Sequence, residues 1–129
     1  FSPLARGALG HTMLDPFTLS ETEFRRQIPR FSTDNWPRNR AIIEGFRSYA
    51  ADRGMSPAAM ALAWVLDQGP HLIPIPATRT ADHLRDWVGA SEIILTQEDH
   101  GMISRLLPVG WAFGDRYNHD QAGTVERYC

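Results

Sequence analysis

Residues 72–89 read LIPIPATRTADHLRDWVG, and this stretch decides the fold that the sequence predicts. Residues 72–76 are apolar and lie between chain-breaking residues, a pattern that favours a short buried strand. Two prolines are unusual inside a strand, because each lacks the N–H group that would join the ladder. Thr80 or Asp82 then begins a helix that ends at Gly89. A strand followed through a short loop by a helix is typical of parallel α/β proteins.

The rest of the chain predicts three more helices and one more strand. Residues 1–4 are expected to be the end of a buried strand, and residues 12–33 a long surface excursion in which prolines prevent a long helix. Capping residues and apolar periodicity predict helices over residues 35–54, 56–66 and 96–108. The second of these is apolar on nearly every side, so we expect it to be buried. The fold class is therefore α/β, but two strands are too few for an independent sheet, for which about three are needed.

Length and composition describe an ordinary globular domain and exclude several classes of protein. The chain has 129 residues, 43% of them apolar, and 13 basic against 15 acidic residues give a formal charge of −2. Nucleic-acid-binding modules are usually basic, so no nucleic-acid partner is expected. Because no run of about 18 apolar residues and no signal-peptide pattern occurs, we expect no membrane segment and a cytoplasmic protein. Phe1 opens the chain inside an apolar turn, which we interpret as a fragment that starts in the middle of a fold.

Metal and disulfide sites are not expected from the distribution of ligating residues. Cys129 is the single cysteine, so neither an intrachain disulfide nor a four-cysteine metal site can form. The five histidines are scattered, with no HxxxH pair and no neighbouring carboxylate at ligand spacing. We therefore predict no metal site in this chain.

Two loops follow the predicted strands, where parallel α/β proteins bind their ligands. The first, residues 1–7, combines an aromatic ring, a hydroxyl, a guanidinium and free backbone N–H groups. The second, residues 77–83, offers threonine hydroxyls, the first N–H groups of a helix and Arg79. Both suit an anionic ligand such as a phosphate. Each also has a purely structural interpretation, since Thr before a helix is usually a cap and Ser-Pro is usually a turn.

An ordered series of motifs resembles the aldo-keto reductases. FSPLARG (residues 1–7) is similar to the turn after that family's seventh strand, commonly YSPLGRG. IPIPATRTADHLRDWVGA (residues 73–90) resembles the family's eighth-strand cofactor segment, typically IPIPGTKRVEHLEENLGA. Residues 31–35, 56–57, 61–66 and 114–117 are also similar to the family at the expected distances. The resemblance implies one domain over residues 1–129: the C-terminal half of a (β/α)8 TIM barrel, with the last two strands, their helices and the C-terminal tail.

The resemblance also implies an NADP(H)-dependent oxidoreductase that reduces a small-molecule aldehyde or ketone by hydride transfer. In that family the ring that matches Phe1 stacks on the nicotinamide, and the residues that match Ser2, Leu4 and Arg6 surround the pyrophosphate. Those that match Thr78 and Arg79 hold the 2′-phosphate of NADPH. Three positions on the expected helix match residues around the adenine and its ribose: His83, Asp86 and Trp87.

Three departures from the family's usual sequence bear on the predicted site. Ala77 replaces Gly, which reduces the backbone freedom of that loop. Trp87 replaces Asn, so an amide that pairs with adenine is lost and stacking would have to substitute for it. Phe1 lacks the hydroxyl of the usual Tyr, which is tolerable because the face of the ring makes the contact.

No residue of this chain matches the family's catalytic Asp, Tyr, Lys and His, and the chain contains no lysine. The catalytic residues are therefore expected in a missing N-terminal half of the barrel. Two alternatives stay open: an NADPH-binding regulatory subunit of the same fold without catalysis, and a half-barrel that associates with itself. The first alternative is decided by whether the preceding sequence carries the catalytic residues. The second is decided by the mass of the protein in solution. The tail residues Trp111, Phe113 and Tyr117 fit two roles equally well: lining a substrate pocket and packing against the fold.

Overall fold

The computed structural model describes residues 1–123. The chain folds as two compact units. Unit 1 consists of Phe1–Leu14 and Ile42–Val109, and unit 2 of Asp15–Ala41 and Gly110–Cys129. Tyr128 and Cys129, which the sequence analysis places in a surface tail, lie outside the described residues.

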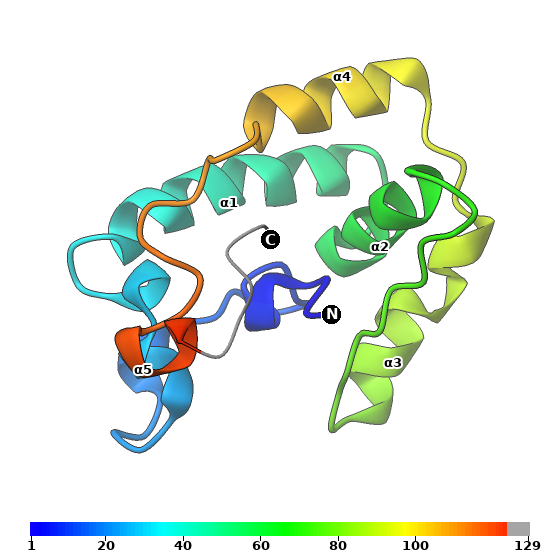
Figure 1. Ribbon diagram of the computed structural model, residues 1–129. Coiled ribbons are helices and arrows are strands. Elements are labelled where there is room, and N and C mark those ends of the chain that lie inside the picture. The colour runs from blue at the N-terminus through cyan, green and yellow to red at the C-terminus, as the bar shows by residue number, and fades with distance from the viewer. Residues whose placement is uncertain (124–129) are drawn as a thin grey trace. The chain divides into compact units, whose positions relative to one another are not determined.

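The described residues form α-helices joined by turns and short 3-10 helices (Figure 1). The α-helices are α1 (Trp36–Asp52), α2 (Pro57–Asp67), α3 (Ala81–Trp87), α4 (Gln97–Leu106) and α5 (His119–Ala122). The 3-10 helices are η1 (Ala5–Gly7), η2 (Pro16–Thr18), η3 (Phe24–Gln27), η4 (Pro29–Phe31) and η5 (Val88–Glu92). Helix α1 contributes residues to both units.

Three of the helix starts that the sequence predicts are confirmed by capping hydrogen bonds. Before α2 the hydroxyl of Ser56 accepts a hydrogen bond from the backbone of Ala59, and Thr80 caps α3 in the same way. Before α4, Thr96 and Asp99 form a capping box, in which each side chain bonds to the other residue's backbone N–H. Helix α2 buries every residue from Ala58 to Ala63 and packs against α3 and η5. The apolar sequence of α2 therefore makes it the centre of unit 1.

The two predicted strands are absent from residues 1–123, which corrects the expectation of strand-containing α/β structure there. Residues 72–76 lie in an irregular connection between α2 and α3, and Ile73 and Ile75 are 82% and 62% exposed. A strand is stable only when a neighbour completes its hydrogen-bond ladder, and no other described segment pairs with these residues. In the other predicted strand, residues 1–4, Ser2 has a φ of 53°, which turns the chain into η1 instead of extending it. The helical layer of the prediction is confirmed, whereas the strand layer is not formed in the described residues.

A buried carboxylate fastens α4 to α1. Asp99 has a fully buried side chain, and its Oδ1 atom accepts hydrogen bonds from the Tyr49 hydroxyl at 2.6 Å and the Arg53 Nε at 2.7 Å. Its Oδ2 atom accepts from Arg53 Nη2 and from the backbone and hydroxyl of Thr96. The hydrogen bonds from Arg53 are the main reason that the pKa of Asp99 lies well below its ordinary value. One ionised side chain thus satisfies both the helix cap and the contact between two helices.

Unit 2 contains a small core that the sequence analysis did not anticipate. Residues 12–33 were expected to be a surface excursion, but Ile28 and Phe31 are buried, and Phe31 lies against Trp36 with ring centroids 5.4 Å apart. The buried amide of Asn39 donates to the carbonyls of Arg30 and Phe113 and accepts from the Phe113 backbone N–H. Arg38 lies over the Phe113 ring at 3.5 Å, so Phe113 has a packing role within this unit.

Within the part of the chain that the structure describes, no helix combines the length and the apolar character needed to cross a membrane.

Replacing Asp99 with Asn is expected to lower the free energy of unfolding by about 2 kcal/mol at neutral pH, because Arg53 and Tyr49 lose a charged acceptor. Because the pKa of Asp99 is lowered in the folded protein, its contribution is complete above the ordinary aspartate pKa of about 4 and is lost as the pH falls below that value. Denaturant unfolding between pH 7 and pH 3 measures both effects. Glu92→Gln, at an exposed position in η5 away from this cluster, is the control and leaves the curve unchanged. An identical acid dependence in wild type and Asp99→Asn would contradict the role of this carboxylate.

Candidate functional site

The first loop is a compact turn whose backbone is largely bonded to itself. The N–H groups of Ala5, Gly7 and Ala8 donate to carbonyls within the loop, as do those of Leu9 and Gly10. Within the predicted loop, residues 1–7, the N–H groups of Ala5 and Gly7 are therefore occupied, whereas those of Ser2 and Leu4 make no hydrogen bond with the described residues. The loop also presents the Phe1 ring, which is 66% exposed, and side chains on an unusual backbone. Ser2, Ala5 and Arg6 are non-glycine residues with φ between 49° and 58°, in the left-handed region.

Helix α1 holds the end of this loop. Nη1 of Arg47 donates to the Gly10 carbonyl at 2.6 Å, and Nη2 donates to the His11 carbonyl at 2.8 Å. A guanidinium can make two such bonds at once because its donors form a rigid planar fork. The position of residues 10 and 11 is thereby fixed relative to α1.

The second predicted loop leads into α3 through a threonine turn. The Thr78 hydroxyl accepts from the Thr80 backbone N–H at 3.2 Å, and the Thr80 hydroxyl accepts from the His83 N–H at 3.3 Å. These bonds support the structural interpretation of both threonines. Arg79 is exposed and makes no hydrogen bond or ion pair with any of residues 1–123. Its guanidinium is therefore available to a ligand.

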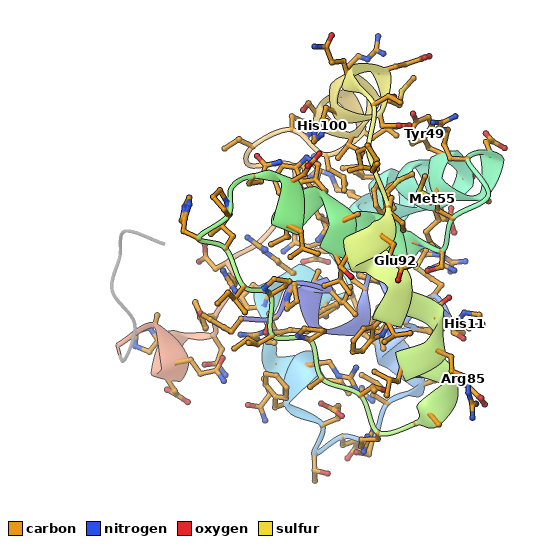
Figure 2. The ribbon with its side chains drawn as sticks, turned by 90° about the vertical axis from the view of Figure 1, so that its right-hand side faces the viewer. His11, Tyr49, Met55, Arg85, Glu92 and His100 are labelled. Carbon is orange, nitrogen blue, oxygen red and sulfur yellow. The ribbon has the colours of Figure 1, made fainter. Side chains whose placement is uncertain are left out.

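Unit 1 brings part of the first loop against α3, through a residue that the sequence analysis did not select. His11 Nδ1 lies 3.4 Å from Asp86 Oδ1, and the His11 and His83 ring centroids are 6.2 Å apart. Figure 2 shows His11 beside the helix that carries Arg85. The Ser56 hydroxyl donates to the Asp86 carbonyl at 3.2 Å, which joins α3 to the start of α2. Of the predicted site residues, His83 and Asp86 thus lie next to His11, which follows the first loop.

The remaining predicted residues are placed around this cluster without direct bonds to it. Trp87 is half-buried, whereas Thr78 is exposed. Ser2 and Leu4 are half-buried, and within residues 1–123 no hydrogen bond joins either of them to residues 78–87. Arg6 lies in η1, in the left-handed conformation. In the same part of the chain, no group of three or more metal-ligating side chains is close enough to hold a metal ion.

Sequence comparison identifies the class of protein to which this arrangement belongs. The model of the aldo/keto reductase family matches residues 1–108, so the chain is a member of that family. The family's fold is a (β/α)8 barrel, and the described residues contain helices without its strands. No solved structure shows significant similarity to the chain.

Among curated proteins, the chain is 35% identical to the aldo-keto reductase str7 of Strobilurus tenacellus over 90% of its own length. It is 33% identical to the probable aldo-keto reductase 1 of Glycine max over 91% of its length. It is 29% identical to the aldo-keto reductase yakc [NADP(+)] of Schizosaccharomyces pombe, again over 91%. In each case the chain spans 34% of the relative, about a third of its length.

The left-handed backbone of the first loop makes a prediction about Ala5, which occupies the position of Gly in the family motif YSPLGRG. Ala5→Gly is expected to raise the free energy of unfolding by about 0.5 kcal/mol, because relief of left-handed strain exceeds the entropic cost of glycine. Ala8→Gly is the matched control, since Ala8 has a φ of −63° and is buried, and it should lower stability by about 1 kcal/mol. Thermal unfolding of both variants measures the contrast. Equal destabilisation by the two substitutions would rule out strain at Ala5.

Proposed function

We propose that this chain is the C-terminal, cofactor-binding part of an NADP(H)-dependent aldo-keto reductase that reduces aldehydes or ketones. The exposed and unpartnered guanidinium of Arg79 is the observation that carries the proposal. A phosphate monoester is the ligand that such a guanidinium binds best, through two parallel charge-assisted hydrogen bonds. The 2′-phosphate is the group by which NADPH differs from NADH, so Arg79 would select between them. One relative, from Schizosaccharomyces pombe, carries NADP(+) in its name, which agrees with this choice.

The chemistry of the other residues fits the rest of the cofactor. The ring of Phe1 is exposed and offers a face on which a planar nicotinamide can stack. The carboxylate of Asp86 is 13% exposed, and a carboxylate accepts hydrogen bonds from donor groups such as those of an adenosine. When bound, the reduced nicotinamide would supply the hydride. Residues of this chain would bind the cofactor and orient it.

Proton transfer to the carbonyl oxygen of the substrate needs a general acid, and no residue of this chain matches the family's catalytic residues. Tyr49 is engaged in a structural hydrogen bond with Asp99, which raises the pKa of its hydroxyl. A tyrosine with a raised pKa and a buried carboxylate partner is a poor proton donor to a substrate. We therefore assign the catalytic acid to the part of the protein that corresponds to the other two thirds of the relatives.

The same missing part would complete the barrel. Ile73, Ile75 and Ala77 direct their N–H and C=O groups to one edge when residues 72–77 are extended, because alternate residues face the same edge. Pro74 and Pro76 face the opposite edge and can only accept hydrogen bonds there. The exposure of Ile73 and Ile75 supports the proposal that these residues form a strand when they pair with strands from outside this chain. In the whole protein we expect residues 72–76 to be the eighth strand.

Arg79→Ala in the whole protein is expected to weaken NADPH binding about thirtyfold, because a charge-assisted hydrogen bond to phosphate is lost, and to change NADH binding less than about twofold. Titration of both cofactors, followed by quenching of tryptophan fluorescence, gives the two dissociation constants. Arg105→Ala removes an exposed arginine from α4 and serves as the control for net charge. Equal losses for NADPH and NADH, or no loss for either, would overturn the assignment of Arg79.

A further inference from the structure

Two segments that resemble the family, residues 31–35 and 114–117, have no part in the proposed cofactor site. In unit 2 they meet at Gly114, which has a φ of 85°. A Cβ atom at this position would lie 2.6 Å from Asn35 Nδ2 and 2.9 Å from the carbonyl oxygen of Pro29. Such distances are too short for a carbon atom, so only glycine lets the two parts of the chain approach this closely.

The buried amide of Asn39 joins the same two parts of the chain. Its Nδ2 atom donates to the carbonyls of Arg30 and Phe113, both at 2.9 Å, and its Oδ1 atom accepts from the Phe113 N–H at 2.8 Å. Because 2% of Asn39 is exposed, water hardly competes for these bonds. Arg30 Nε also donates to the Gly114 carbonyl at 3.2 Å. We call these contacts the clasp; its residues are Pro29, Arg30, Asn35, Asn39, Phe113 and Gly114.

The segment that the clasp holds, residues 110–117, has little structure of its own. It contains no helix, and within it residues 112–115 make no backbone–backbone hydrogen bond with any described residue. Residues 111–113 are half-buried, and Gly114 is exposed. A segment with so few internal bonds and so little burial opens at a low cost in free energy unless other contacts hold it. Its position therefore depends on the clasp.

We infer that residues 110–117 are a strap that closes unit 2, and that release of the clasp opens this unit while unit 1 stays folded. Unit 2 consists of two stretches of chain, and the clasp joins one stretch to the other. Its core residues Ile28, Phe31 and Trp36 are buried when the strap is closed. Unit 1 has its own core around α2 and contains no residue of the clasp. The inference concerns a conformational change and does not depend on the proposed cofactor.

Hydrogen exchange of the whole protein, followed by mass spectrometry, measures the opening of each unit separately. Gly114→Ala is expected to speed exchange in residues 28–36 at least about tenfold, because the added Cβ pushes the strap away while Asn39 is kept. Asn39→Ala should have a similar effect, since the strap loses both hydrogen bonds at Phe113. In both variants, exchange in residues 58–63 of α2 should change less than about twofold.

Gly110→Ala is the matched control, because Gly110 also has a positive φ, of 78°, but no other part of the described chain lies within 4 Å of the added Cβ. It introduces similar backbone strain without the close approach, and should speed exchange in residues 28–36 less than about threefold. Equal acceleration by Gly110→Ala and Gly114→Ala would overturn the inference, because strain alone would then explain both. Unchanged exchange in residues 28–36 would also overturn it, as would an equal rise in α2, because the two units would then open together.

Discussion

The two hydrogen bonds from Arg47 to the backbone of Gly10 and His11 are the interaction on which the candidate site depends. They join the first loop to α1, the helix to which Asp99 also fastens α4. The loop contains three left-handed residues, and the two hydrogen bonds from Arg47 add to those within the loop. Because Arg47 fixes its end, the loop can present Phe1 at one side and His11 at the other. Helix α1 is thus the scaffold of unit 1, although its sequence shows no sign of a functional role.

Local signals in the sequence account for most of the helical structure. Ser56, Thr80 and Thr96 all cap helices where expected, since an N-cap needs only a hydroxyl and the backbone a few residues later. The strand prediction failed in the described residues because a strand depends on a neighbour, which the apolar run 72–76 does not encode. The cluster of Asp99 with Tyr49 and Arg53 could not be foreseen for a similar reason. Its partners lie about fifty residues apart, and capping was a sufficient reason for an Asp at that position.

Some residues of the candidate site could likewise be predicted from their local sequence, whereas others depend on contacts between residues far apart in the chain. Thr78 and Arg79 could be singled out because the sequence predicts a strand, a loop and a helix in succession there, and the exposure of Arg79 agrees with a role in binding. In the first loop the turn uses the N–H groups of Ala5 and Gly7 internally, so fewer are left for an anion than the sequence predicts. His11 was overlooked because a lone loop histidine is usually solvated, and only the fold shows that Asp86 and His83 lie beside it.

The central claim is that this chain recognises the phosphorylated adenosine end of the proposed cofactor. Calorimetric titration of the whole protein with 2′,5′-ADP and with 5′-ADP tests it most directly, because these ligands differ in the phosphate on the 2′ position and lack the nicotinamide. We predict that 2′,5′-ADP binds at least about tenfold more tightly, as charge-assisted bonds to one phosphate would provide. Equal affinity for the two nucleotides would contradict the claim.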